Sequence, residues 1–145
     1  MKITIEEPRP GEEDEIVIRC REIDPEILRL VSSLKEDRTK LTGYSEEGIS
    51  MLSPKEIYYF ESVDNKVFAY TKDSVFEIRM KLYELEEQLT GTDFLRISKS
   101  TIVNLPKVRH LAPKLNGRFE ATMKNGEIVV ISRQYMGALK EKLGI

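Results

Sequence analysis

The sequence has few of the residues that enzyme, metal and nucleotide sites usually need. His110 is its only histidine and Cys20 its only cysteine, so the common zinc sites and cysteine–histidine dyads are nearly excluded. The phosphate-binding loops G-x-x-x-x-G-K-[ST] and G-x-G-x-x-G do not occur. We therefore expect a protein that is not an enzyme, needs no cofactor or metal, and has no small-molecule substrate.

Long apolar runs are missing as well. No stretch approaches the roughly 18–20 apolar residues that span a bilayer, and the N-terminus has no apolar signal-peptide core. A single cysteine cannot form an internal disulfide, which favours a cytoplasmic location. We expect Cys20 to be a small buried hydrophobic residue on a strand. The 145 residues suit one globular domain with a small extension.

The charge is small overall but unevenly distributed. The formal net charge is −2, which alone argues mildly against nucleic acid. Residues 1–50 hold 8 Lys and Arg against 13 Asp and Glu, giving −5, and residues 51–93 hold 5 against 9, giving −4. Residues 94–145 hold 10 against 3, giving +7. A polyanion would meet this local basic segment and not the average charge.

The first 40 residues indicate two strands and a helix. Apolar and polar residues alternate in Lys2–Glu6 and Ile16–Arg21, which predicts two short strands. Asp24 as an N-cap, followed by Pro25 at the first helical position, predicts a helix over about 25–36. We interpret this strand–strand–helix unit as an extension with a dimerisation or regulatory role.

From about Lys40 the sequence pattern is typical of β structure. Alternation predicts strands, and Asp64-Asn65 and two Asn-Gly pairs predict hairpin turns between them. The expected strands are 40–45, 48–53, 56–63, 66–72, 75–79, 118–124 and 127–131, and the segment 94–104 is expected to begin extended. Helices are expected at 81–89 and after Ser132. The fold class is therefore mainly β with minor helices (α+β), with mostly antiparallel sheets.

The most specific signal is a block of polar residues at fixed spacing. Phe94-Leu-Arg-Ile-Ser-Lys-Ser-Thr-Ile-Val-Asn104 is followed further along by Ser132-Arg-Gln-Tyr135. The block resembles the LytTR family of bacterial DNA-binding domains, whose pattern is F-x-R-[IC]-[HS]-[KR]-S-x-[ILV]-V-N and then S-R-x-Y. The resemblance implies a domain over 41–145 with stacked antiparallel sheets and a minor helix, which contacts DNA through loops.

The polar residues of this block suit contacts with nucleic acid. In an extended segment Arg96, Ser98 and Ser100 would share one face, and small donors beside a basic group suit phosphate contacts. A lysine can also reach guanine O6 and N7 in the major groove. The resemblance implies that Lys99 contacts DNA bases or backbone. The alternative is the solvated rim of a strand.

Two further segments supply candidate contacts. Arg133, with its neighbour Gln134, lies just beyond a β run, and its planar guanidinium can bind guanine or phosphate. The resemblance implies that Arg133 contacts DNA and that Asn65 or Lys66, in a tight turn, enters a neighbouring major groove. Taken singly, each could be an ordinary surface side chain. Further phosphate contacts are expected from Lys107, Arg109, Lys114 and Arg118.

The block departs from the family pattern at two positions. Ser98 occupies a position that is often histidine, and Thr101 one that is often aromatic. Serine is a hydrogen-bond donor of shorter reach, so we expect a different base specificity with binding retained. Asn104 is expected to bond neighbouring backbone in the turn before Pro106.

The leading hypothesis is a sequence-specific transcriptional regulator that binds double-stranded DNA. The resemblance implies that loops around Lys66, Lys99 and Arg133 enter successive major grooves, and that two copies bind repeated sites. Some short family members are held inactive by a membrane-bound inhibitory partner, which is a further expectation. Only about 40 residues precede the domain, and they show no phosphoacceptor pattern, so regulation by phosphorylation of this chain is not expected.

The alternative hypothesis belongs to another class of protein. The acidic N-terminal unit would make the chain a protein-interaction or adaptor module, which binds a partner or self-associates, and DNA binding would be weak or lost. Base contacts and a steep dependence of affinity on salt would distinguish the first hypothesis from the second.

Overall fold

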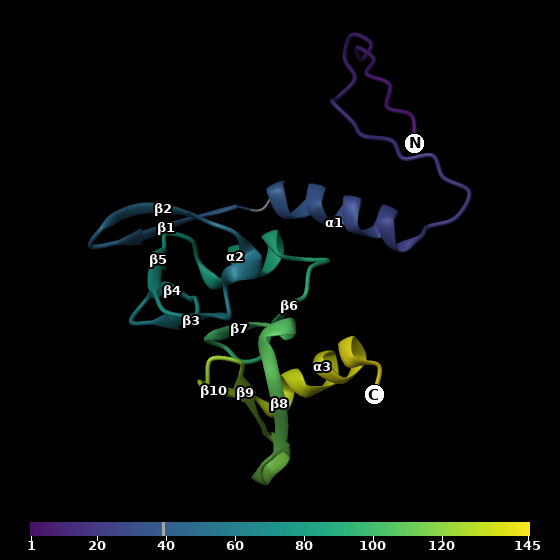
Figure 1. The fold of residues 1–145 in the computed structure, drawn as a ribbon. Helices are drawn as coiled ribbons and strands as arrows, with labels where there is room; N and C mark the ends of the chain where they lie inside the picture. Colours follow the sequence, from purple (N-terminus) through teal and green to yellow (C-terminus); the bar gives the residue numbers. More distant parts are fainter. Residues whose placement is uncertain (39) are drawn as a thin grey trace.

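The computed structural model describes residues 1–38 and 40–145, with ten strands and three α-helices (Figure 1). The strands are β1 (Leu41–Ser45), β2 (Gly48–Leu52), β3 (Tyr59–Val63), β4 (Lys66–Tyr70), β5 (Val75–Ile78), β6 (Phe94–Arg96), β7 (Thr101–Asn104), β8 (Val108–Pro113), β9 (Phe119–Met123) and β10 (Ile128–Ile131). The α-helices are α1 (Pro25–Arg38), α2 (Leu82–Gln88) and α3 (Met136–Leu143). Short 3₁₀ turns span Pro54–Glu56, Leu105–Lys107, Leu115–Gly117 and Arg133–Tyr135. This mainly β arrangement confirms the expected fold class.

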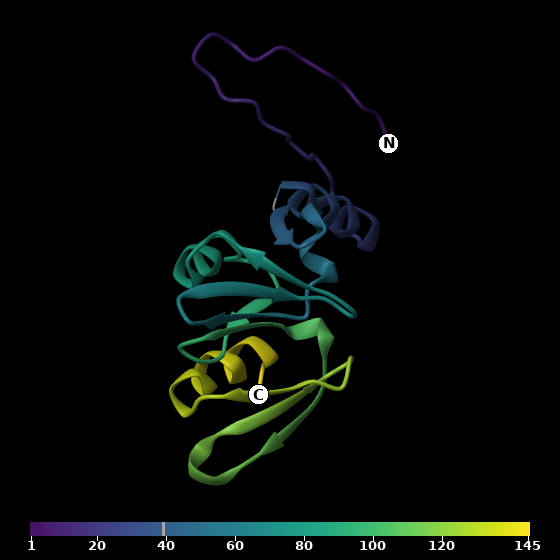
Figure 2. The ribbon, with the colours of Figure 1, turned by 90° about the vertical axis from the view of Figure 1, so that its left-hand side faces the viewer.

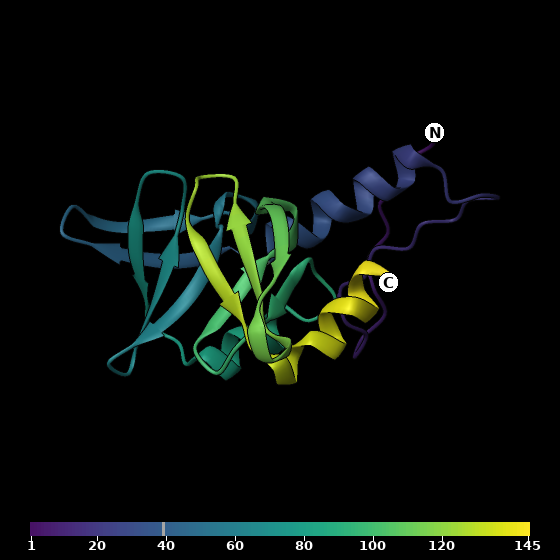
Figure 3. The same ribbon diagram turned by 90° about the horizontal axis from the view of Figure 1, so that it is seen from below.

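Two antiparallel sheets are stacked in the domain (Figure 2). The larger sheet has the order β2-β1-β5-β4-β3-β7-β6, and the smaller has the order β10-β9-β8. Helix α2 packs on one face of the larger sheet, and the smaller sheet with α3 packs on the other. Seen from below, α1 and α3 extend toward the side where both chain ends lie (Figure 3).

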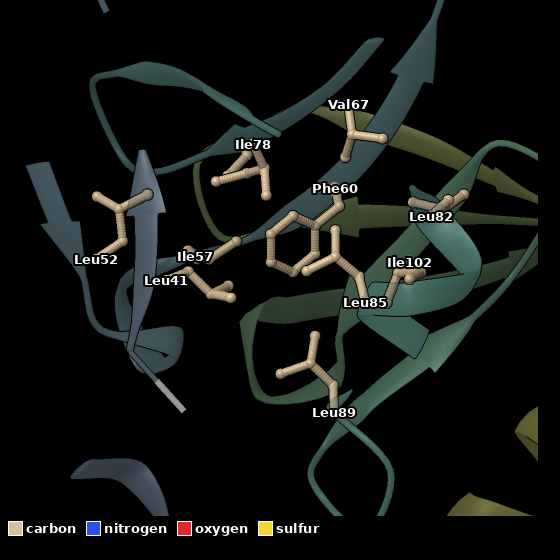
Figure 4. Close-up of a cluster of buried hydrophobic side chains, with 11 residues drawn as sticks. Leu41, Leu52, Ile57, Phe60, Val67, Ile78, Leu82, Leu85, Leu89 and Ile102 are labelled. Carbon is tan, nitrogen blue, oxygen red and sulfur yellow. The ribbon is translucent and has the colours of Figure 1, made fainter. Parts of the chain in front are cut away.

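Each face of the larger sheet has its own hydrophobic core. Successive residues of a strand point to opposite faces, so Phe60 and its partner Ile102 face α2, whereas Tyr59 and Val103 face the smaller sheet. Phe60 lies in the middle of the first core, beside Leu85 of α2 (Figure 4). The second core also includes Ile97, Ala121, Met123, Val129, Ile131, Met136 and Leu139.

The strands predicted from Lys40 onward are present, with ends shifted by a few residues. The largest shift is in the segment expected at 56–63, where β3 begins only at Tyr59 because Pro54–Glu56 forms a 3₁₀ turn. Asp64 and Asn65 have φ angles of 50° and 65°, the left-handed conformation of both central residues in a type I′ hairpin turn. The short C-terminal helix is also present as α3, with Leu139 buried.

Residues 94–104 begin extended, as expected, but they do not continue as one strand. Strands β6 and β7 pair with each other as a hairpin, and residues 97–100 form the loop between them. The Ile97 N–H donates to the Thr101 carbonyl at 3.0 Å, and the Ile97 side chain is fully buried. Because this side chain is buried, it fixes the position of the loop in which the chain reverses direction.

The two N-terminal strands predicted at Lys2–Glu6 and Ile16–Arg21 are wrong, because neither segment is a strand in the structure. Alternation gives a chain two different faces, but a strand also needs a hydrogen-bonded neighbour. Cys20 lies in this region and is exposed, so its predicted burial is also wrong. The helix is correct: the Asp24 carboxylate accepts a hydrogen bond from the Ile27 N–H at 2.9 Å, as an N-cap does.

Helix α1 lies against the end of the larger sheet where β7 finishes. Leu28 and Val31 of α1 line a groove together with Pro54 and Pro106. Asn104, the last residue of β7, also lines this groove. We call this part of the molecule the α1 end.

Tyr59 and Tyr70 stack between the two sheets. Their ring centroids are 4.4 Å apart and the rings are 11° from parallel. Burial is the largest cause that raises the pKa of Tyr59 to about 12, and the charges of Glu127, Tyr70 and Glu61 add to it. Burial likewise raises the pKa of Tyr70. Both phenols are therefore neutral at ordinary pH.

Candidate nucleic-acid interface

Three turns meet at the end of the larger sheet where β7 begins. In the antiparallel pair of β3 and β7, Glu61 lies opposite Thr101, so the hairpin tip after β3 lies beside the β6–β7 loop. The Ser62 N–H donates to the Ser100 carbonyl at 2.8 Å. On the other side, the Ser132 N–H donates to the Ile97 carbonyl at 2.8 Å. We call residues 64–66, 97–100 and 132–134 the turn cluster.

The turn cluster contains most of the residues that the sequence singled out. The structure brings together Asn65, Lys66, Ser98, Lys99, Ser100, Arg133 and Gln134. All of these except the half-buried Ser98 are exposed. Main-chain hydrogen bonds hold the loops, while the side chains of Lys66, Lys99 and Arg133 are left in solvent. This arrangement presents three cations on a fixed backbone, which suits a polyanionic ligand.

The two serines of the β6–β7 loop shape the loop itself. Ser98 Oγ accepts a hydrogen bond from the Ser100 N–H at 3.2 Å and lies 3.4 Å from Ser100 Oγ. Because the segment turns here, Arg96, Ser98 and Ser100 do not form the common strand face that we expected. Lys99, at the tip of the loop, remains exposed.

Arg96 points back into the protein. Its Nε donates to the Ser98 carbonyl at 2.7 Å, its Nη2 donates to the Lys99 carbonyl, and its Nη1 lies 2.8 Å from Glu86 Oε2. Its side chain is 17% exposed. The guanidinium that the sequence assigned to DNA contact is thus bonded within the protein.

Arg133 follows β10 and opens a 3₁₀ turn. The Ser132 carbonyl accepts from the Tyr135 N–H at 2.9 Å, and the Ser132 side chain makes no capping hydrogen bond. The stem of Arg133 passes close to Gly117: a Cβ at that glycine would lie 3.1 Å from Arg133 Cγ and Cδ. Gly117, with φ of 72°, therefore leaves room for the arginine stem.

Not all predicted basic contacts lie in the turn cluster. Lys107 comes after the far end of β7 and lines the groove at the α1 end, with its Nζ 5.0 Å from the centre of the Tyr58 ring. Arg109, on β8, is exposed beside a β-bulge. Lys114 lies near the turn that contains Gly117 and pairs with Glu120 at 3.6 Å. The phosphate contacts of these residues stay predictions.

Asn104 forms backbone hydrogen bonds, as expected, but not with the neighbouring turn. Its Nδ2 donates to the Ile57 carbonyl at 2.8 Å, and its own N–H donates to the Tyr58 carbonyl at 2.9 Å. Asn104 is buried, so it links β7 to the segment before β3 at the α1 end.

Sequence reasoning missed two residues that shape the turn cluster. Glu86, on α2, is half exposed, yet it pairs with Arg96 at 2.8 Å. Gly117 was noted only as part of an Asn-Gly hairpin signal. Neither role has a local sequence signal, because both partners lie in other elements.

Comparison with known proteins identifies a family for this fold. The family described as the LytTr DNA-binding domain matches residues 47–144. Proteins from Staphylococcus aureus strains NCTC 8325 and COL, both described as uncharacterized HTH-type transcriptional regulators, are 34% identical over 119 residues, covering 82% of this chain and 80% of theirs. A similar protein from strain MRSA252 is 33% identical over the same length.

A solved structure gives the same result. The LytTr DNA-binding domain of a protein from Bacillus cereus, described as a methyl-accepting/DNA response regulator, superposes with a TM-score of 0.70 at 25% identity. The match covers 73% of this chain and 97% of that domain. The stacked sheets and the family match define a β-rich DNA-binding domain. The chain belongs to the LytTR DNA-binding domain family. No helix in the described part of the chain is long and apolar enough to cross a membrane.

Proposed function

We propose that the protein is a sequence-specific transcriptional regulator whose turn cluster enters successive major grooves along one face of double-stranded DNA. The observation that carries this proposal is the meeting of Lys66, Lys99 and Arg133, which come from three separate segments, at one end of the larger sheet. Turns from three segments can reach positions along a groove that one short helix would not cover. A lysine or arginine in the major groove can bind guanine O6 and N7.

The hydrogen bonds beneath the turns support this role. Two main-chain bonds of 2.8 Å tie the β6–β7 loop to Ser62 and Ser132. A loop that is already ordered loses less conformational entropy on binding. Arg133 can use its guanidinium fork on guanine or phosphate, whereas Lys66 and Lys99 act as point charges.

The proposal includes a homodimer that binds repeated sites in the cytoplasm. We assign DNA binding to residues 41–145 and self-association or regulation to residues 1–40. The position of helix α1 supports this division. The helix lies at the end of the larger sheet where β7 finishes, and it leaves the turn cluster uncovered. Control by a membrane-bound inhibitory protein stays a prediction of the resemblance.

Selection of bound sequences from a random DNA pool tests the proposal. We expect a repeated motif whose spacing reflects two bound copies. Fluorescence titrations of the selected DNA across a salt series should then show log affinity falling with log salt, by about 0.9 for each neutralised phosphate. A pool without enrichment, together with affinity that is equal for selected and scrambled DNA, would contradict sequence-specific binding.

The exposed N-terminal segment favours one second candidate function, that of an interaction module. Ile3 and Ile5 are 84% and 94% exposed, although their alternation is typical of a strand that has a partner. In that case the chain would self-associate or bind a protein while its DNA affinity stays weak at every salt concentration. Light scattering of the full chain, measured beside the DNA titration, distinguishes the two candidates.

A further inference from the structure

Arg96 contacts the two carbonyl groups on either side of one residue. The Ser98 carbonyl belongs to the peptide unit before Lys99, and the Lys99 carbonyl belongs to the peptide unit after it. Arg96 Nε donates to the first at 2.7 Å, and Nη2 donates to the second. Because peptide units are planar, rotation of these two units is what changes φ and ψ of Lys99. One guanidinium therefore fixes both backbone dihedrals of Lys99.

We infer that Arg96 is a positioning residue, which sets the direction of the Lys99 side chain and does not itself contact DNA. Its side chain is 17% exposed, and its Nη1 is occupied by Glu86 Oε2 at 2.8 Å. A guanidinium has five N–H donors in a rigid plane, so it can hold two carbonyls and a carboxylate at once. Lysine has no such fork and could not replace it.

Glu86 completes the arrangement from α2. It follows Leu85, which is fully buried in the first core. The backbone that carries Glu86 is thereby anchored to the core. Its half-exposed carboxylate pairs with Arg96, which in turn bonds the loop around Lys99. This inference rests on the proposed function, since it assumes that Lys99 contacts DNA.

The test removes the ion pair without a change in net charge. In the full-length chain, Arg96→Gln/Glu86→Gln should speed amide hydrogen exchange of residues 98–100, measured without DNA. The matched control, Glu87→Gln/Lys140→Gln, removes the same two charges from exposed positions and should leave this exchange unchanged. Glu86→Gln alone is a milder second variant, with the same direction of effect, if the double variant unfolds.

DNA affinity then separates positioning from direct contact. We expect the double variant to lose affinity for the selected DNA by no more than Lys99→Ala does, about 5- to 150-fold for a base contact. In a Lys99→Ala background it should cause no further loss, because both changes act through one side chain.

Three outcomes would overturn the inference: unchanged exchange at 98–100, unchanged affinity despite faster exchange, or additive losses. Additive losses with a salt slope shallower by about 0.9 would mean that Arg96 neutralises a phosphate. If the wild-type chain bound no selected DNA, the proposed function would fail, whereas the exchange experiment would still test whether Arg96 holds the loop.

Discussion

The two ends of strand β7 differ in whether main-chain or side-chain groups form the contacts. Where β7 begins, main-chain hydrogen bonds hold the turn cluster, and Lys66, Lys99 and Arg133 extend into solvent. Where β7 finishes, the side chains themselves are engaged: Asn104 bonds the Ile57 carbonyl, and the Lys107 ammonium lies over the Tyr58 ring. One end has free cations on a fixed backbone, and the other uses its polar side chains for packing.

Basic charge in the sequence does not by itself locate a binding surface. Residues 94–145 carry a net charge of +7, but the chain distributes those cations over both ends of the sheets. Strand β7 separates Lys99 from Lys107, at about 3.3 Å for each residue of the strand. Substitutions at the two ends should therefore have different effects on DNA affinity and on stability.

The largest expected effect is on the core beneath the turn cluster. Ile97 is fully buried inside the β6–β7 loop, so Ile97→Ala should lower the free energy of unfolding by about 2–5 kcal/mol. Leu30→Ala, on the exposed side of α1, should change it by less than about 0.5 kcal/mol. Urea denaturation measures both. Equal losses of unfolding free energy for the two variants would contradict the difference described between the two ends of β7.

The next effect is on DNA binding. Arg133→Ala should weaken binding to the selected DNA by about 5- to 150-fold, as expected for the loss of a base contact by an exposed arginine. Lys107→Ala, at the α1 end, should change affinity less than about threefold, because it removes at most one phosphate contact, which salt screens. Fluorescence titration at one salt concentration compares them. A larger loss of affinity for Lys107→Ala than for Arg133→Ala would mean that DNA binds at the α1 end, contrary to our proposal.

A smaller effect is expected on helix α1. Asp24→Ala removes the acceptor of the Ile27 N–H, and an N-cap of this kind is worth about 0.5–2 kcal/mol. Far-UV circular dichroism should show reduced helix content, while affinity for a single half-site stays unchanged. A loss of half-site affinity would mean that α1 supports the turn cluster directly.

The smallest effect concerns alkaline pH. The pKa of Tyr59 is raised to about 12 in the folded protein, chiefly by burial, whereas an unfolded tyrosine titrates near 10. The unfolded chain therefore loses this proton first, so the stabilisation is complete below about pH 10 and is lost as pH rises toward about 12. Tyr59→Phe should flatten this fall in alkaline denaturation curves. A curve with an unchanged slope would assign the fall to other groups.

Local sequence patterns were sufficient for most of the domain. Alternation and tight-turn residues predicted the strands after Lys40, except β8 and the hairpin of β6 and β7. Both signals act between near neighbours; Asp64 and Asn65, for example, adopt the predicted turn. The family motif located Lys99 and Arg133 at the turn cluster. The same alternation failed in Lys2–Glu6, where no paired strand is present.

The sequence-based predictions that were wrong within the domain share a different physical cause. Residues 97–100 turn because Ile97 is buried and because Ser62 and Ser132 bond the loop from distant segments. Arg96 bonds inward because α2 presents Glu86. Likewise, Asn104 finds the Ile57 carbonyl 47 positions away. Contacts of this kind depend on the assembled sheets and leave no local pattern in the sequence.

The exposed tip of the β6–β7 loop has a consequence for how such proteins diversify. The conformation at Lys99 is held by neighbours, while its own side chain forms no hydrogen bond or ion pair that would be lost on replacement. Under the proposed function, a new residue at this position would therefore alter the preferred operator without a penalty in folding. If Lys99 contacts DNA as proposed, regulators built in this way would acquire new target genes through single substitutions, and duplicated copies would diverge while each remains stable.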